Sequence, residues 1–434
     1  MRSMFFRKNL QGDTGDCGAE RVDPVSSHNA PIAPKRCRGR LVAVVALVAT
    51  ACLAAQENVY LTEVPDYEWH LGCFGTACGN LIGFWDRHGF PNFYTGPTAG
   101  GVAPLNSYGA NHDIRSLWAS EAGRDGRPWN KPGHTEDYWI EYENAAPDPY
   151  VTVQRPEHEP DCIGDFIGLN QNRWRNMNGE CDGNIDGFCF NYWDKTGARR
   201  LNFTPDESAG TPARDLQSGL RAFASFCGYE ADVFSQLIDV SPETPPGTGF
   251  TFEDLQAEIR AGYPVLIWLQ DPMRRSQPRI QLSQGNPDIH GMLAYGYLVD
   301  SDGTRYVRIR TSWATGDYEF REWAFKTWMP NPWDYLPPRG VICFRPKPKV
   351  LGVKREHGRV TIRWHAPSSE LYEPDTGVRT RVHMWVVERA TSLNPSDFQP
   401  VTNPTDQQEA VIPDTNADSA FFRLKLVTPS QSSN

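Results

Sequence analysis

Glycine and proline recur along the whole chain at spacings that leave no room for a long helical array. The chain has 434 residues, of which 37 are Gly and 35 are Pro. Both residues end or kink helices and favour turns. Aromatic residues make up 12% of the sequence, with 14 Trp, which is far above the content of an intrinsically disordered chain. We therefore expect two or three turn-rich globular domains with substantial cores.

One apolar run near the start, LVAVVALVATACLAA at residues 41–55, has the features of a secretory signal peptide. Basic residues precede it, small residues follow it, and it is short for a bilayer span of about 20 residues. We expect residues 1–55 to be a cleaved leader, so that the mature protein is secreted or extracytoplasmic and has no membrane span. A lipoprotein attached through Cys52 is the alternative. The net charge of −10 argues against a nucleic-acid partner.

Cysteines are numerous after the leader, and their number is odd. In an oxidising compartment this predicts disulfides together with at least one free thiol. Their spacing does not define the pairing, and no Cys/His pattern predicts a zinc site. The cysteines that follow the leader are Cys73, Cys78, Cys162, Cys181, Cys189, Cys227 and Cys343.

Residues 57–345 contain helix and strand patterns, apart from an irregular insertion at 98–212. Three helices are expected around residues 77–85, 216–227 and 251–261, followed by Gly89, Gly228 and Gly262. The third begins with Thr251 and Asp254, close to a capping box. Strands are expected at 263–270, 290–300 and 305–313, and the last two flank a Ser-Asp-Gly-Thr hairpin turn. Helices followed by antiparallel strands predict an α+β domain.

The region 351–428 contains only strand patterns, separated by turns rich in Pro, Asn and Asp. This spacing predicts a small all-β sandwich, and the segment VVERATSLNPSDFQPV resembles fibronectin-type-III-like modules of secreted bacterial enzymes. Spacing, surface binding or attachment to the cell surface is the role we expect for it.

A thiol at a helix start and a histidine at a strand start carry the chemistry that the sequence suggests. Cys73 follows a Gly just before the first expected helix. Backbone N–H groups at such a position stabilise a thiolate and can bind the oxyanion of an acyl-transfer intermediate. His290 opens an expected strand and could supply the base that a nucleophilic thiol needs. Gly291 beside it is expected to leave space for a substrate backbone.

At these residues the chain resembles papain-like cysteine peptidases, in the branch that processes bacteriocin leaders at double-glycine sites. The matching residues are Gly72, Cys73, Thr76, Ala77, Trp85, Asp86, His290, Met292, Gly296 and Tyr297. The resemblance implies a helix carrying Cys73 packed on an antiparallel sheet carrying His290. It also implies a peptide or protein substrate, a Cys73 nucleophile and a His290 general base, with no required cofactor.

Three positions depart from the pattern of that family. Gly75 stands where Pro is common, and Tyr67 stands where a Gln helps to form the oxyanion hole. Thr311 occupies the position of the Asn or Asp that orients the histidine, and a Thr hydroxyl can bond an imidazole without stabilising its charge. Asp300 and Asp317 are alternative orienting carboxylates.

The segment CDGNIDGFC at 181–189 suggests a structural calcium site. Asp182, Asn184 and Asp186 followed by Gly reproduce the start of a calcium-binding loop, but Trp193 occupies the twelfth position where an EF-hand has Glu. A solvated turn closed by its flanking cysteines is the simpler interpretation.

Other functions remain open at this point. No Gly-x-Ser-x-Gly or His-Glu-x-x-His motif occurs, and acidic residues are too numerous to identify a glycosidase pair. Cys73 could instead be half of a disulfide in a degraded peptidase that only binds. The aromatic residues Trp118, Trp129, Trp139 and Trp174 would then form a peptide- or carbohydrate-binding platform.

Overall fold

The structure is a computed structural model. It describes residues 56–67, 72–94, 102–106, 163–167, 191–193, 199–202, 216–239, 247, 249–270, 289–312, 321–324, 338–415 and 420–427. All of them belong to one compact unit, Cys52–Asn434.

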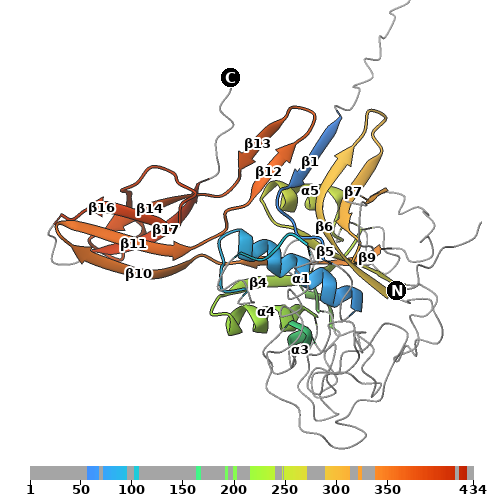
Figure 1. Cartoon of the computed structure of the whole chain (residues 1–434), viewed down its shortest axis with the longest axis horizontal. Coiled ribbons are helices and arrows are strands. Elements are labelled where there is room, and N and C mark those ends of the chain that lie inside the picture. Colours follow the sequence, from blue (N-terminus) through green and yellow to red (C-terminus); the bar gives the residue numbers. More distant parts are fainter. Residues whose placement is uncertain are drawn as a thin grey trace, which may run out of the picture. The chain divides into compact units, whose positions relative to one another are not determined.

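One large sheet organises the described residues, and nearly all of its pairs are antiparallel (Figure 1). Its strands are β1 (Glu57–Leu61), β2 (Asn191–Trp193), β3 (Arg199–Asn202), β4 (Ala231–Leu237), β5 (Val265–Gln270), β6 (Ile289–Val299), β7 (Arg305–Arg310), β8 (Arg321–Ala324), β9 (Pro338–Pro346), β12 (Glu370–Glu373) and β13 (Val378–Arg381). The strand order is β13-β12-β1-β6-β5-β9-β4-β2-β3, and β7 also pairs with β6 and β8. Segments distant in sequence are thus neighbours in the middle of the sheet.

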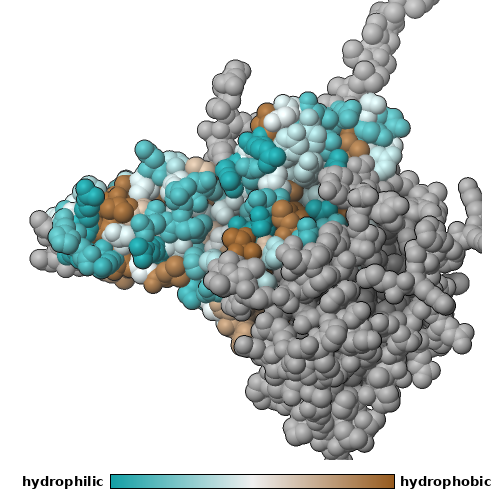
Figure 2. Space-filling view, in the orientation of Figure 1, coloured by the Kyte–Doolittle hydropathy of each residue, from teal (hydrophilic) through white to brown (hydrophobic). Residues whose placement is uncertain are grey.

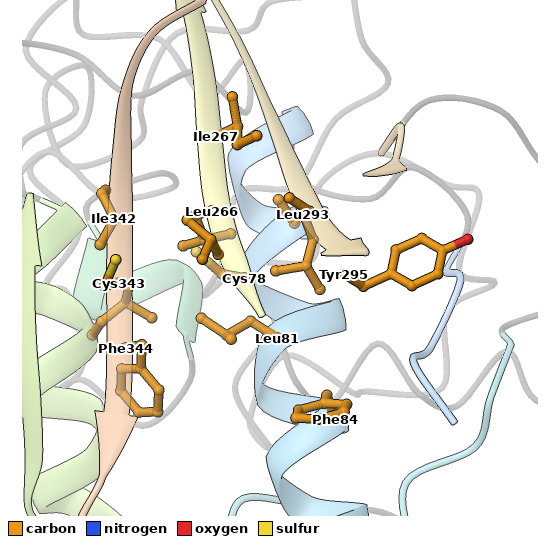
Figure 3. Packing of buried hydrophobic residues seen from close by; sticks show 14 of the residues in the cluster. Cys78, Leu81, Phe84, Leu266, Ile267, Leu293, Tyr295, Ile342, Cys343 and Phe344 are labelled. Carbon is orange, nitrogen blue, oxygen red and sulfur yellow. The ribbon is translucent and has the colours of Figure 1, made fainter. Parts of the chain in front are cut away.

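Helix α1 (Gly72–Arg87) packs across β5 and β6 and carries much of the core. In Figure 3, Cys78 and Leu81 of α1 lie close to Leu266 of β5 and Leu293 of β6. All four of these side chains are buried. The remaining helices are α3 (Ile163–Ile167), α4 (Leu216–Phe226) and α5 (Phe252–Arg260). The sheet therefore holds α1, and with it Cys73, in a fixed place.

Local signals in the sequence correctly place the helix ends. Gly89 and Gly228 follow α1 and α4 with φ angles of +106° and +82°, a left-handed conformation that favours glycine. Thr251 and Asp254 form the expected capping box at the start of α5. The predictions of these three helices are confirmed.

The expected hairpin between β6 and β7 is also confirmed. Asp300 donates its backbone N–H to Thr304 at 2.9 Å, and Gly303 donates to Asp300 at 3.0 Å. Gly303 has a φ of +84°, which this tight turn requires.

The C-terminal residues add two three-stranded sheets. One contains β10 (Lys349–Glu356), β11 (Arg359–His365) and β16 (Glu409–Pro413), and the other contains β14 (Met384–Ala390), β15 (Gln399–Pro400) and β17 (Phe421–Val427). Buried residues of both sheets, among them Trp364 and Trp385, form a common hydrophobic cluster. The edge strand β10 is exposed along its whole length, and Figure 2 shows hydrophobic residues scattered among hydrophilic ones on this part of the surface.

The predicted fold class, an α+β papain-like domain followed by an all-β sandwich, is wrong. The described residues are mostly antiparallel β-sheet, with 45% in strands and 21% in helices. The C-terminal strands do not simply follow the first part as a sandwich, because β12 leaves them and pairs with β1. Leu371 of β12 joins the large core, and the rings of Tyr372 and Tyr60 meet edge to face at 5.4 Å. This burial explains why the β12–β13 hairpin extends the large sheet.

Candidate functional site

Cys73 is the second residue of α1, where the first backbone N–H groups of the helix have no partner within the helix. Its side chain is partly exposed and packs against the large core. Its sulfur is a free thiol. The prediction that a thiol stands at a helix start is therefore confirmed, and the disulfide alternative for Cys73 is not what the structure shows.

The residue of β6 that contacts this thiol is Gly291, which directly follows His290. Gly291 donates its N–H to the Sγ atom of Cys73 over 3.4 Å. In the sheet, His290 pairs with Leu269 and Gly291 pairs with Trp268 of β5. The structure thus brings the start of α1 and the start of β6 together, although 218 positions separate Cys73 from Gly291.

Gly291 is required for this approach, but its role differs from the expected one. A Cβ atom there would lie 2.6 Å from the Phe74 ring, and Phe74 is 3% exposed. The space above Gly291 is therefore filled by Phe74 and not left for a substrate backbone. Its N–H contact to Cys73 was not predicted; the only sequence signal for it was a Gly following a strand-opening His.

Burial dominates the electrostatics of the thiol. It raises the pKa of Cys73 to about 11, although the N–H groups of Gly291, Phe74 and Cys73 itself act in the opposite direction. These three donors favour the thiolate without outweighing desolvation. At neutral pH the thiol is therefore protonated, and any reaction at sulfur needs a base that removes the proton during attack.

The candidate orienting residues lie at different ends of the β6–β7 hairpin. Thr311 directly follows β7, whose last paired residue, Arg310, is opposite Leu293, so Thr311 is near the end of the hairpin that contains His290. Asp300 lies in the turn at the other end, where its carboxylate accepts the N–H groups of Asp302 and Thr304. The length of β6 separates Asp300 from His290, so the interpretation of Asp300 as the orienting carboxylate is wrong. Asp317 lies outside the described residues.

Tyr67, at the position where the related peptidases have Gln, is part of the core. Its hydroxyl donates to the carbonyl of Pro104 at 2.7 Å, and the residue is 1% exposed. Asn80 accepts the backbone N–H of Tyr67 at 2.9 Å. The hydroxyl proton is thus already used, and Tyr67 does not replace the Gln as an oxyanion donor.

Packing also accounts for several residues that carry the family resemblance. Asp86 accepts the backbone N–H groups of Tyr94 at 2.9 Å and Ala103 at 2.8 Å, and burial raises its pKa to about 7. A Cβ atom on Gly296 would lie 2.5 Å from the side chain of Tyr60. These positions serve the fold irrespective of any reaction.

The other predicted site residues form no second site among the described residues. Cys78 is fully buried in the core, and Cys227 and Cys343 are free thiols as well. The predicted calcium ligands Asp182, Asn184 and Asp186 lie outside the described residues, as do the four Trp of the alternative binding platform. In the described part of the chain, no three His, Cys, Asp or Glu side chains come together as a metal site.

Comparisons with known proteins do not assign the chain to a family. No protein-family model matches it, and no curated protein matches it. Among the residues that the structure describes, no helix is both long and apolar enough to cross a membrane.

Proposed function

We propose that the chain is an exported thiol hydrolase that cleaves peptide bonds, with Cys73 as nucleophile and His290 as general base. The observation that carries the proposal is the 3.4 Å contact between the Cys73 sulfur and the N–H of Gly291. It brings the thiol to the residue next to His290, which is the juxtaposition that a Cys–His pair needs. Residues 41–55, with their signal-peptide features, are the basis for the proposed export.

The reaction follows from the position of the thiol. His290 takes the thiol proton as sulfur attacks the substrate carbonyl carbon, and it returns that proton to the amine that leaves. Water then hydrolyses the thioester. Backbone N–H groups at the start of α1 stabilise the negative carbonyl oxygen. Thr311 is the proposed orienting residue for the imidazole, a role in which an uncharged hydroxyl is weaker than a carboxylate.

A binding module without hydrolysis is the second candidate, and one observation favours it. Desolvation raises the pKa of Cys73 to about 11, and a thiol that stays protonated at neutral pH is a poor nucleophile. In this alternative the domain recognises a peptide or carbohydrate with its aromatic residues.

The two candidates are separated by covalent labelling of the mature chain. A peptide vinyl sulfone should label wild type at Cys73 in one-to-one stoichiometry, and peptide-library hydrolysis should stop in Cys73→Ala. Cys78→Ala is the matched control, because it removes a thiol from the same helix but from the core, and it should retain labelling and hydrolysis. Full hydrolysis by Cys73→Ala would refute the proposal, and absence of both labelling and hydrolysis in wild type would favour the binding module.

A further inference from the structure

The segment between β11 and β12 contacts the C-terminal ends of α1 and α5. The Ala366 carbonyl oxygen lies 1.9 Å from the place where a Cβ of Gly89 would be. Ser368 donates its N–H to the His88 carbonyl at 3.2 Å, and the Ser369 hydroxyl donates to the Gly262 carbonyl at 2.9 Å. This close contact joins the C-terminal strands to the end of α1.

Two buried histidines lie in this contact. His88 and His383 are 2% and 1% exposed. His88 Nε2 donates to the carbonyl of Thr62 at 3.2 Å, and its ring packs on Phe84 with centroids 4.2 Å apart. His383 comes from the segment that precedes β14, so each side of the contact contributes one imidazole.

The hydrogen bonds define the protonation state of His383. Its Nδ1 lies 2.9 Å from the Ser369 hydroxyl. Because that hydroxyl donates to Gly262, Nδ1 must carry the proton of the neutral ring. Its Nε2 is buried and has no hydrogen-bond partner. A second proton on Nε2 would therefore be a charged donor without an acceptor, which is strongly unfavourable in an apolar place.

The charged groups around the two rings do not compensate for such a proton. For His88, Glu63 and backbone hydrogen bonds with Ser368 and Thr62 raise the pKa, and Arg87 lowers it. Glu63 and Arg87 form an ion pair at 3.1 Å. The ring of Tyr263 packs edge to face on His383 at 5.3 Å. Burial is the largest effect for both histidines and lowers the pKa of His88 to about 4 and that of His383 to about 3. His88 also lowers the pKa of His383.

We propose that His88 and His383 form an acid-sensitive lock between the C-terminal strands and the end of α1, the helix that carries Cys73. In this lock both imidazoles are neutral, and acidification releases residues 366–369 and 382–383, which flank the β12–β13 hairpin, from the ends of α1 and α5. The inference concerns the contact alone, so it holds or fails independently of hydrolysis at Cys73.

The expected effect follows from proton linkage. Both folded pKa values lie below the ordinary value of 6.5, so the stabilisation is fully present above pH 6.5 and is lost as the pH falls below it. At pH 5, protonation favours the released state by about 30-fold for each histidine.

Hydrogen exchange of the full mature chain between pH 7 and pH 4, corrected for intrinsic exchange rates, tests the lock. We expect the amides of Ser368 and Val382, which donate to the carbonyls of His88 and Ser369, to lose protection on acidification while amides of β5 and β6 remain protected. The double variant His88→Gln, His383→Asn replaces both titrating rings with side chains that can still form a hydrogen bond. The pH midpoint at which its amides lose protection should lie at least one pH unit lower than in wild type. His357→Asn, at an exposed turn between β10 and β11, is the matched control and should not shift.

Simultaneous loss of protection at Ser368 and Val382 and in β5 and β6, or release of the double variant at the wild-type pH, would overturn the proposal. If the double variant does not fold, the titration of both histidines in wild type is followed by NMR instead. Titration midpoints below pH 5.5 for both imidazoles support the lock, and a midpoint at or above pH 5.5 for either one overturns it.

Discussion

An added methyl group at Gly291 tests how closely β6 packs against Phe74, the residue that follows Cys73 in α1. A Cβ atom there would lie 2.6, 2.8 and 2.9 Å from three atoms of the Phe74 ring, whereas ordinary contacts begin at 3.4 Å. Phe74 is 3% exposed, so its ring is enclosed by the core. Gly291→Ala therefore forces the ring to shift by about 0.8 Å, and such overpacking costs about 1–3 kcal/mol of folding free energy.

The same shift should change the chemistry of the neighbouring thiol. The Gly291 N–H lowers the pKa of Cys73, and displacement of α1 from β6 weakens that contact. We expect Gly291→Ala to reduce the rate at which Cys73 reacts with iodoacetamide at fixed pH. Urea unfolding followed by tryptophan fluorescence measures the loss of stability, and mass spectrometry of the labelled Cys73 peptide measures the rate.

Two further variants make this prediction refutable. Gly352→Ala is the matched control, because a Cβ there meets nothing within 4 Å, and its effect should stay within about 0.5 kcal/mol. Phe74→Leu should recover part of the loss when it is combined with Gly291→Ala, as a double-mutant cycle would detect. Equal stabilities of Gly291→Ala and Gly352→Ala would refute the packing argument.

Three other predictions concern Asp86, Cys78 and residues 181–189. The raised pKa of Asp86, about 7 against 3.8, means that its contribution to stability falls as the pH rises from 4 to 7. The stability of Asp86→Asn relative to wild type should therefore improve over that range by up to about 4 kcal/mol, and a pH-independent difference in urea unfolding would contradict this. Cys78→Ala should cost about 1 kcal/mol with unchanged Cys73 labelling, and loss of labelling would show that it disturbs the site. If residues 181–189 bind calcium, a chelator should lower the Tm and added Ca²⁺ restore it, whereas an unchanged Tm would favour a plain turn.

The parts of the fold that the sequence predicts correctly are those with local signals. Gly89, Gly228 and the Thr251–Asp254 box act within one helical turn, so the residues themselves identify the helix ends. The β6–β7 hairpin likewise depends on a turn of a few residues. Strand pairing across the sheet has no such signal, because β9 lies between β4 and β5, and β1 pairs with β12. The sequence therefore predicts a separate sandwich that includes the β12–β13 hairpin.

The site was predictable to a similar extent. The Gly-Cys before an apolar helix identifies Cys73 as a thiol at a helix start. Its contact with Gly291, the filling of that space by Phe74, and the distance of Asp300 from the start of β6 all depend on the register of the sheet. The contact that buries His88 and His383 likewise joins distant parts of the chain, as in the bond from Ser368 to the His88 carbonyl, so neither histidine stands out in the sequence.

The pairing of β1 with β12 has a consequence for when the protein can finish folding. The Thr62 side chain donates to Glu370, 308 positions later in the chain. At a synthesis rate of about 5–20 residues per second, β1 waits roughly 15–60 s for the strand that covers its edge. During that interval the first strand presents open backbone groups on which other chains can add. Completion of the large sheet thus depends on the last fifth of the polypeptide, and a nascent chain interrupted before β12 is left with an exposed edge.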